Sequence, residues 1–279
     1  MARRTLFRPA ELSGVGLHTG RFSRLHLLPA SKKGLYFTFG DESFSLAQAR
    51  GESSGRGTDL HFPGGRVLRT AEHLMAALFG MALDDLEIAV EGEEVPAADG
   101  SALPFVEAIE SAGIVESDEP SEAFAIPFPI GVDDPLKGRS ICALPGAALF
   151  LTYVISFSHP SVGVQYLSCE VDPERFRREI APARTFAFLD EVESLRRSGL
   201  ARGGSLENAV VIGDDGVLNR DGLRFPDEFV RHKLLDLLGD LAVLGCRLTG
   251  HVVACRAGHD LHLALADRID RIRPRRDRT

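Results

Sequence analysis

The sequence predicts an α+β fold in two halves, and three observations support this. Short segments with period-two alternation or continuous apolar runs indicate strands, for example Phe22 to Leu28 and Leu149 to Phe157. Segments with helical spacing, such as residues 225–240, indicate helices. An acidic, apolar-poor stretch from Glu116 to Glu122 separates the two halves. Strands and helices occur on both sides of it, and no sequence repeat relates the halves.

We therefore expect an N-terminal α+β domain over residues 1–116, a linker at residues 117–123 and a C-terminal α+β domain over residues 124–272. Residues 273–279 form a predicted basic tail, part of an arginine-rich end that begins at Arg268. Two readings of this charge stay open, a solvated, frayed tail and weak attraction to an anionic membrane surface.

Composition excludes several classes of protein. With 279 residues, of which 44% are hydrophobic and 26% charged, the chain is an ordinary globular sequence. A net charge of -8 disfavours a nucleic-acid-binding protein, because the phosphate backbone requires a basic surface. Four scattered cysteines without CxxC spacing indicate neither a disulfide framework nor a thiolate zinc site. No run of eighteen apolar residues and no signal peptide is recognised, so we expect a cytoplasmic protein.

In the N-terminal half, residues 11–20 are predicted as a strand interrupted by glycines, followed by the strand from Phe22. Two interpretations of the glycines are open, a tight hairpin or a substrate loop that presents His18 and Thr19. Residues 51–58 are expected to form an exposed loop. A helix should run from Thr70, as N-cap, to Gly80, with Glu72 and His73 in its first turn. Its apolar stripe is Leu74, Ala77, Leu78 and Met81.

The remaining elements follow from the same patterns. A strand at residues 86–90 and a helix at 104–112 complete the first half. In the second half we expect strands at 124–132, 140–144, 149–157, 209–212 and 247–256, and helices at 173–179, 189–197, 225–240 and from about 260 onward. His259 would then lie at a strand-to-helix junction, where side chains commonly face a cleft.

The helix predicted at residues 225–240 carries the first indication of chemistry. Residues four apart lie on one helix face, so His232 and Asp236 project together. The spacing alone is also typical of a surface pair or a buried structural histidine. Asp240 adds a second carboxylate one turn further on, and Gly239 leaves room beside these side chains. Two stacked acids beside a histidine repel each other unless a cation or a protonated histidine lies between them, which raises the case for a metal site.

His73 is the natural third ligand, because two imidazoles, one carboxylate and an open position form a hydrolytic zinc site. Glu72 could then accept a proton from the attacking water as general base, although a lone acid in a first helical turn is also explained by the helix dipole. His259 could protonate a leaving amine, with Asp240 holding it charged. The hydroxyl of Thr185 and the ammonium group of Lys233 could stabilise a developing oxyanion.

The sequence resembles a known family, the UDP-3-O-acyl-N-acetylglucosamine deacetylases. These are zinc amidases that catalyse the committed step of lipid A synthesis. The matching segments span nearly the whole chain in the order of the family, and their combination is highly specific although each one alone is weak. They are Gly14 to Gly20, Thr70 to Leu74, Asp99 to Ser101 with Pro104 and Phe105, Ala183 to Phe186, Gly203 to Ser205, Leu218 and Asn219 with Asp221 to Phe225, His232 and Lys233 with Asp236, Gly239 and Asp240, and Gly258 with His259.

The resemblance implies two similar two-layer α/β sandwich domains, packed together with the active site between them. It implies zinc on His73, His232 and Asp236, with Fe²⁺ as an alternative ion in the cell. The implied reaction is hydrolysis of the N-acetyl group of UDP-3-O-acyl-N-acetylglucosamine. An insert at about residues 186–206 would form an apolar passage for the acyl chain. The residues implied to contact this UDP-sugar acyl substrate are Leu17, His18, Thr19, Phe186 and Gly204.

We expect a monomer with no nucleic-acid partner and at most peripheral contact with a membrane. Two departures from the family pattern affect the expected substrate contacts. Arg256 and Ala257 precede Gly258-His259 where many members have Lys-Ser, and Asp260 and His262 follow where they have Ala and Asn. Residues 56–58, Arg-Gly-Thr, stand where the family often has an apolar loop near the metal.

Two rival functions use the same residues. A non-haem iron oxygenase also binds its metal through two histidines and a carboxylate, although those ligands usually come from strands. A non-catalytic protein that binds sugar nucleotides could retain the fold without the reaction. A requirement for oxygen would indicate the first rival. Retention of full turnover after loss of Glu72 or His259 would contradict their assigned roles.

Overall fold

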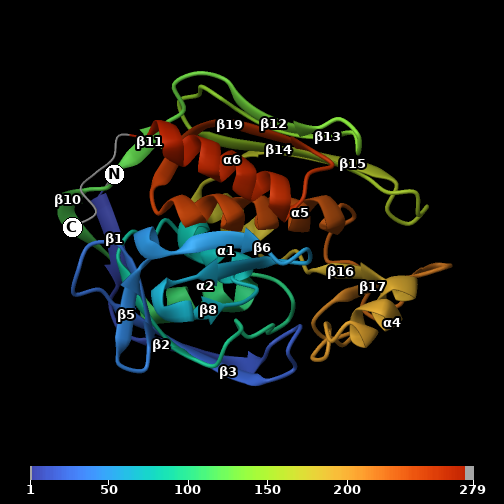
Figure 1. Cartoon of the computed structure of the whole chain (residues 1–279), viewed down its shortest axis with the longest axis horizontal. Helices are drawn as coiled ribbons and strands as arrows, with labels where there is room; N and C mark the ends of the chain where they lie inside the picture. The colour runs from blue at the N-terminus through green and yellow to red at the C-terminus, as the bar shows by residue number, and fades with distance from the viewer. Residues whose placement is uncertain (1, 274–279) are drawn as a thin grey trace.

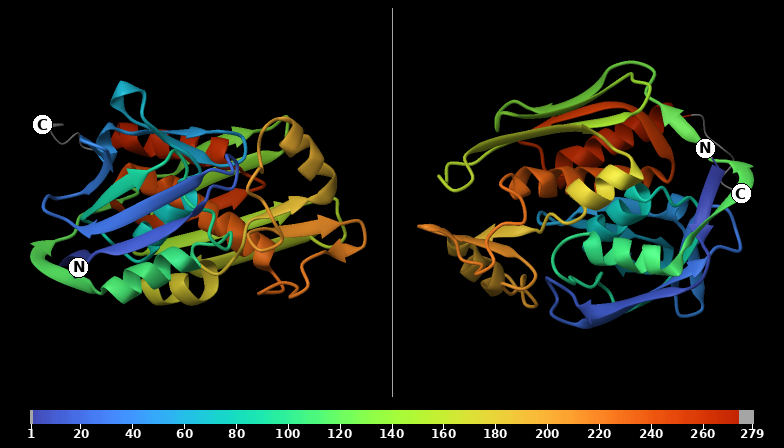
Figure 2. Two further views of the ribbon diagram at one scale, coloured as in Figure 1. Left: turned by 90° about the horizontal axis from the view of Figure 1, so that it is seen from below. Right: turned by 180° about the vertical axis from the view of Figure 1, so that it is seen from behind.

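The computed structural model describes residues 2–273, so most of the predicted basic tail, residues 274–279, lies outside it. The described chain forms four layers in the order sheet, helices, helices, sheet (Figure 1 and the right panel of Figure 2). The two outer layers are large sheets, and the helices that cover their inner faces pack against each other in the middle of the molecule.

The sheet of the N-terminal half has the strand order β2-β3-β9-β4-β5. Its strands alternate buried and partly exposed residues, as in β9, because one face packs on helices and the other faces outward. Helices α1 (Glu72–Gly80) and α2 (Leu103–Ala112) cover the inner face. The strands are β2 (Ala10–Val15), β3 (Phe22–Pro29), β4 (Leu35–Phe39), β5 (Glu42–Ser45) and β9 (Leu86–Glu91).

The sheet of the C-terminal half has the strand order β12-β13-β19-β14-β15, with β11 pairing beside β19. Helices α5 (Glu228–Leu241) and α6 (His259–Ile272) cover its inner face. The alternation is clearest in β19, the central strand, where every second residue is buried. The strands are β11 (Ala123–Ala125), β12 (Ile130–Asp134), β13 (Arg139–Leu144), β14 (Leu149–Ser156), β15 (Val164–Glu170) and β19 (Arg247–Cys255).

The two halves share one topology. In the first sheet β3 pairs antiparallel with both β2 and β9, and β9 pairs parallel with β4. In the second sheet β13 pairs antiparallel with both β12 and β19, and β19 pairs parallel with β14. Helix α1 directly precedes β9 and α2 follows it, while α5 precedes β19 and α6 follows it, so α1 corresponds to α5 and α2 to α6. This confirms the prediction of an α+β fold with two similar sandwich domains. The repeat lies in the order of elements and not in residue identity, which is why the sequence does not reveal it.

The corresponding helices α1 and α5 pack directly on each other across the middle of the molecule. A side chain at Gly239 would lie only 2.1 Å from the backbone oxygen of Glu72, so the two helix backbones are in contact there. Gly239 therefore serves close packing, because any larger residue would push α5 away from the start of α1.

Smaller elements complete the chain. Strands β1 (Ala2–Leu6) and β10 (Ile114–Pro120) pair antiparallel, and β6 (Arg50–Ser53), β7 (Thr58–His61) and β8 (Val67–Leu68) form a small sheet. Short helical segments are η1 (Leu46–Gln48), η2 (Pro63–Gly65), α3 (Pro173–Arg175), the π-helix η3 (Phe176–Ile180) and η4 (Ala242–Leu244). Among residues 2–273, no helix has the length and apolar composition needed to cross a bilayer.

The insert predicted at about residues 186–206 lies in a distinct unit beside the four layers (Figure 1). This unit extends past the predicted end of the insert. It consists of β16 (Phe186–Phe188), α4 (Leu189–Arg197), β17 (Val210–Gly213) and β18 (Gly216–Val217), with β16, β17 and β18 in one sheet. Helix α4 has no buried residue and is amphipathic. The insert returns to the first half, because Gly203 donates a backbone hydrogen bond to Leu17.

Several local predictions differ from the structure, most of them because of a tertiary contact. The segment predicted as a linker is largely strand β10, which β1 recruits as its partner. The strand predicted at 124–132 is two strands, β11 and β12, which pair with different neighbours. Strand β15 was not predicted. Thr70 is not the N-cap of α1, since the cap position is Ala71 and the hydroxyl of Thr70 donates to Glu94.

Candidate active site

Three side chains from both halves meet where α1 crosses α5. His73 lies in the first turn of α1, while His232 and Asp236 project from one face of α5, as their spacing predicts. The Nε2 atoms of His232 and His73 lie 3.2 Å and 3.6 Å from Oδ1 of Asp236. The two imidazole rings are nearly perpendicular, at 89°, with centroids 5.0 Å apart. All three residues are buried.

These three residues fit a divalent metal ion. Oδ1 of Asp236 is buried and makes no hydrogen bond within residues 2–273, which is costly for a carboxylate oxygen unless a cation binds it. Nδ1 of His232 lies 3.1 Å from the carbonyl oxygen of Ala183. A carbonyl only accepts, so Nδ1 carries the proton and Nε2 keeps its lone pair for a metal. The other oxygen of Asp236 accepts a 2.7 Å hydrogen bond from Lys233.

The electrostatics agree with this arrangement. Burial lowers the pKa of His232 to about 4, so its ring is neutral and able to act as a ligand near pH 7. Burial alone would raise the pKa of Asp236, but the neighbouring His232 and Lys233 hold it well below its ordinary value. A neutral imidazole beside an ionised carboxylate is the protonation state that a bound cation requires.

Glu72 lies beside this group at the start of α1 and is also buried. Its Oε2 accepts a 2.8 Å hydrogen bond from the backbone N–H of Thr58. Gly57 allows this approach, since a side chain there would lie 2.6 Å from Oε1 of Glu72. Burial raises the pKa of Glu72, which makes it a stronger proton acceptor than an exposed glutamate.

A second buried cluster adjoins the first. His259, at the start of α6, places Nδ1 2.7 Å from Oδ2 of Asp240, which lies one turn beyond Asp236 on α5. Burial alone would lower the pKa of His259, but Asp240 raises it to about 9. Nε2 of His259 faces the first cluster, 3.8 Å from Oδ2 of Asp236. His262 also contacts Asp240, with Nδ1 2.7 Å from the same Oδ2.

The residues expected to stabilise an oxyanion are near the three-residue cluster. Lys233 is held beside it by Asp236, and its ammonium group lies 5.8 Å from the centroid of the Phe186 ring. The backbone of Thr185 is fixed on both sides by hydrogen bonds with Gly100 and Val210. Thr185 lines a small pocket together with His73, Leu17, Thr70, Val95, Pro96, Ala97 and Gly100.

Of the predicted substrate residues, Leu17 lines this pocket, and the others lie on the 17–19 loop and the insert near it. A side chain at Gly204 would meet Leu17 at 3.7 Å, so the insert and the 17–19 loop are neighbours. Nδ1 of His18 lies 3.4 Å from the backbone nitrogen of Ala201. Phe186 packs edge-on against His232, with ring centroids 6.2 Å apart.

Thr19 is held by Glu94, because its hydroxyl and its backbone N–H both donate to this buried carboxylate. The backbone N–H of His18 and the hydroxyl of Thr70 bind the other oxygen of Glu94. Glu94 therefore ties the substrate loop to the residues that precede α1, and Thr19 anchors the loop.

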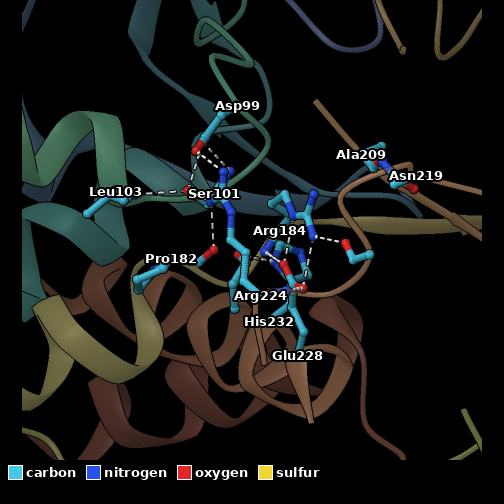
Figure 3. A network of polar contacts seen from close by, with 12 residues as sticks. Asp99, Ser101, Leu103, Pro182, Arg184, Ala209, Asn219, Arg224, Glu228 and His232 are labelled. Atoms are coloured by element: carbon cyan, nitrogen blue, oxygen red, sulfur yellow. Dashed lines mark hydrogen bonds and ion pairs between the residues drawn. The ribbon is translucent and has the colours of Figure 1, made fainter. Parts of the chain in front are cut away.

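A buried ion pair fixes the segment that supports His232 (Figure 3). Nε and Nη2 of Arg184 donate to the two carboxylate oxygens of Glu228 at 2.8 and 3.1 Å. The backbone N–H groups of Arg184 and Arg224 donate to Glu228 as well. Arg224 reaches from there to the carbonyl of Pro182 and to Asp99 in the first half. Residues 182–185, including the carbonyl of Ala183, are thereby held in one position.

Sequence reasoning missed four residues of this site. Glu228 could have been found, because it precedes His232 by the same four residues that separate His232 from Asp236. His262 follows His259 at a spacing that need not place it on the same face, but the first turn of α6 directs both histidines to Asp240. Thr58 was predicted in an exposed loop and is buried, with its hydroxyl 2.5 Å from Oδ1 of Asp240. The carbonyl of Ala183 gives no side-chain signal.

Two imidazoles and a carboxylate that fit a metal ion lie in this α+β fold, with a further carboxylate and imidazole beside them. This arrangement is that of a metal-dependent hydrolase. The family model for UDP-3-O-acyl N-acetylglycosamine deacetylase (LpxC) matches residues 3–271. The chain therefore belongs to this family, whose members are metal-dependent amidohydrolases of lipid A biosynthesis.

Curated relatives agree with this assignment. A protein of Syntrophotalea carbinolica named UDP-3-O-acyl-N-acetylglucosamine deacetylase is 45% identical over 95% of this chain and 86% of its own length. Proteins with the same name are 45% identical in Geobacter sp. strain M21, over 93% of this chain and 86% of the relative, and 43% identical in Myxococcus xanthus, over 96% and 86%.

Proposed function

We propose that this chain hydrolyses the N-acetyl group of UDP-3-O-acyl-N-acetylglucosamine, releasing acetate and UDP-3-O-acyl-glucosamine, as the committed step of lipid A biosynthesis. The observation that carries the proposal is the unsatisfied Oδ1 of Asp236, buried beside the Nε2 atoms of His73 and His232. We assign zinc to these three residues, with Fe²⁺ as the alternative ion in the cell. When bound, the ion supplies Lewis-acid activation of the water and the amide carbonyl.

Glu72 and His259 each carry out one of the two proton transfers of the reaction. Glu72 takes a proton from the attacking water, for which its burial and raised pKa are suited. The water oxygen then bonds to the amide carbon. His259 delivers a proton to the amide nitrogen through Nε2, and the C–N bond breaks to give acetate and a free amine. Asp240 keeps His259 protonated before this step.

Lys233 and Thr185 complete the assignment. The charge that develops on the carbonyl oxygen is stabilised by the ammonium group of Lys233 and the hydroxyl of Thr185. Both are supported by neighbours that do not depend on substrate, namely Asp236 for Lys233 and the backbone contacts of Thr185 with Gly100 and Val210. Such donors need little reorganisation during the reaction.

The remaining assignments concern substrate and domain limits. Leu17, His18, Thr19, Phe186 and Gly204 are assigned to substrate binding, Thr19 through the loop that it anchors. The insert at about residues 186–206 is assigned to the acyl chain, because its backbone contacts the 17–19 loop beside the pocket. We place the N-terminal domain at residues 1–116 and the C-terminal domain at 124–272.

The proposal includes a setting for the enzyme. We assign it to the cytoplasm as a monomer, with a small-molecule UDP-sugar acyl substrate, at most peripheral membrane contact and no nucleic-acid partner. The net charge of -8 supports the last point, because it opposes binding to a polyanion.

The decisive test is a deacetylation assay with UDP-3-O-acyl-N-acetylglucosamine substrates of graded acyl length. We expect acetate release that depends on acyl length, is abolished by a chelator and is restored by zinc in the absence of oxygen. Binding of the sugar nucleotide without acetate release would favour a non-catalytic binding protein. A strict requirement for oxygen would favour the oxygenase.

A further inference from the structure

His262 has no part in the chemistry described so far, yet it is fully buried beside it. It lies three residues after His259 on α6, and its Nδ1 is 2.7 Å from Oδ2 of Asp240. Nδ1 of His259 is 2.7 Å from the same oxygen. One carboxylate oxygen therefore receives two imidazole N–H groups, one from the assigned acid and one from a residue without an assigned role.

The carboxylate of Asp240 is held at both oxygens. Its Oδ1 accepts a 2.5 Å hydrogen bond from the hydroxyl of Thr58, and its Oδ2 accepts the two imidazoles. A carboxylate only accepts, so both Nδ1 atoms carry protons and Nε2 of His259 is the nitrogen turned toward Asp236. The direction of that nitrogen therefore depends on how firmly Asp240 is held.

His262 is itself fixed from the opposite side. Its Nε2 lies 2.9 Å from the hydroxyl of Tyr153, a fully buried residue of strand β14. The same hydroxyl donates a 2.8 Å hydrogen bond to the carbonyl of Ala257, two residues before His259. Tyr153 thus connects the central sheet to His262 and to the turn from which His259 projects.

We propose that His262 is a positioning residue for the deacetylase reaction. It fixes the orientation of the Asp240 carboxylate and, through it, the direction of Nε2 of His259. This inference rests on the assignment of His259 as the general acid. Removing the partners that orient metal-ligating histidines typically changes activity by about 10-fold to 100-fold, and we expect an effect of the same order for this partner of the Asp240–His259 pair.

Two isosteric variants separate the two contacts of His262. The side-chain amide nitrogen of asparagine occupies nearly the position of Nδ1 of histidine, so His262→Asn retains the donor to Asp240 and loses the contact with Tyr153. The amide of glutamine reaches instead to the position of Nε2, so His262→Gln retains the contact with Tyr153 and loses the donor. His262→Leu removes both contacts and introduces an apolar side chain of similar size.

We expect His262→Gln and His262→Leu to lower kcat by about tenfold or more, with KM and bound zinc unchanged. His262→Asn should retain kcat within about threefold of the native enzyme, because the donor to Asp240 survives. Equal kcat in all three variants would overturn the proposal. The proposal would also fail if His262→Leu lowered kcat while raising KM and lowering zinc content to a similar extent, since this indicates general damage to the site.

A double variant distinguishes this inference from the function on which it rests. If His259→Ala alone leaves kcat unchanged, the assignment of the acid fails, whatever His262 does. If His259→Ala lowers kcat, adding His262→Leu should cause little further loss, because both act through one proton transfer. Fully additive losses would show that His262 acts independently of His259 and would overturn the proposal.

Proton NMR of the zinc-loaded enzyme supplies a readout that does not require turnover. The hydrogen-bonded Nδ1 proton of His259 should give a sharp downfield resonance in the native enzyme and in His262→Asn. It should broaden or move in His262→Leu, because the acceptor is then less firmly held. An unchanged resonance in a folded His262→Leu variant would contradict the role of His262.

Discussion

The two site histidines on α5 and α6, His232 and His259, are oriented in the same way, by an acceptor that binds Nδ1. Nδ1 of His232 is bound by the carbonyl of Ala183, and Nδ1 of His259 is bound by the carboxylate of Asp240. The nature of the acceptor distinguishes their roles. A neutral carbonyl leaves His232 uncharged for a metal, whereas a buried carboxylate favours a protonated His259.

The assigned proton transfers predict a specific pattern in two variants. Glu72→Ala removes the proton acceptor and His259→Ala removes the donor, while His73, His232 and Asp236 remain in place. Each variant should lower kcat for acetate release by about a hundredfold or more, because general acid–base catalysis contributes this much. Steady-state assays with metal analysis of the same samples would measure both properties.

Bound zinc should stay near one equivalent in both variants, which separates a catalytic loss from loss of the ion. His61→Ala provides a control, because it removes a partly exposed histidine of strand β7 that lies outside the site. Native turnover in Glu72→Ala or His259→Ala would remove that residue from the mechanism.

Single residues were predictable from the sequence when their partners lay on the same helix. His232, Asp236 and Asp240 follow from spacing on α5, and the structure brings His73 and Glu72 to them. Thr58 could not be found this way, because its partner Asp240 is 182 residues away and the segment itself is polar and glycine-rich. The burial that turns this threonine into a site residue comes from packing of the two halves.

Helix α5 contributes a stripe of four acidic or imidazole side chains at intervals of four residues, namely Glu228, His232, Asp236 and Asp240. Each has a different partner. Glu228 binds Arg184, and His232 binds the carbonyl of Ala183. Asp236 binds Lys233 and faces the two histidines proposed as metal ligands, and Asp240 binds His259 and His262. Four buried polar groups on one face are tolerated because each is engaged in this way.

The Arg184–Glu228 pair predicts how stability changes with pH. Burial alone would raise the pKa of Glu228, but the hydrogen bonds from Arg184 and the backbone lower it below its ordinary value of 4.5. A carboxyl group whose pKa falls on folding stabilises the protein above its unfolded pKa. That contribution is lost as the pH falls through the folded pKa. Native protein should therefore lose stability from this group below about pH 4.5.

Glu228→Gln should lower the free energy of unfolding at neutral pH by about 3 kcal/mol, because it leaves the buried guanidinium of Arg184 without its counter-charge. The difference between the variant and the native protein should shrink as the pH falls. Urea unfolding at several pH values would measure it. The exposed pair Arg21–Glu93 is the matched control, and Glu93→Gln should change stability by less than about 1 kcal/mol. A constant difference at all pH values would contradict the role of Glu228.

Helices were easier to predict than strands, for a physical reason. The helix at 225–240 is observed as α5, and η4 extends it to Gly245, which has the left-handed backbone expected of a terminator. The strand at 124–132 was predicted as one element because its apolar residues continue through the break. Strand pairing depends on distant neighbours, so β11 joins β19 in parallel while β12 joins β13 antiparallel.

The molecule as a whole is two copies of one topology that meet through equivalent helices, α1 and α5. The proposed metal ligands are divided between them, with His73 from the first half and His232 and Asp236 from the second. Gly239 permits the close approach on which this depends. No pattern within either half could establish that residues 73 and 232 meet, so the sequence supported the ligand set only as a prediction.

This division predicts that the metal holds the two halves together. Zinc binds the assembled site and not the unfolded chain, so it should raise the midpoint of thermal unfolding of metal-free protein. A ligand at a thousand times its dissociation constant stabilises by about 4 kcal/mol. His73→Ala retains both ligands on α5 but loses the link to α1. Its unfolding midpoint should therefore rise much less on addition of zinc.

Differential scanning calorimetry with and without zinc would compare the native protein, His73→Ala and the control His61→Ala. The native protein and the control should show one transition that zinc moves as a whole, because α1 and α5 unfold together when the ion joins them. If zinc moves His73→Ala as far as the native protein, the ion is held within the second half alone. If zinc moves only part of a divided transition in the native protein, the ion does not connect the halves. Either result would show that metal binding does not depend on the packing of α1 on α5. Because Oδ1 of Asp236 lies between His73 and His232, we expect metal binding and this packing to occur together.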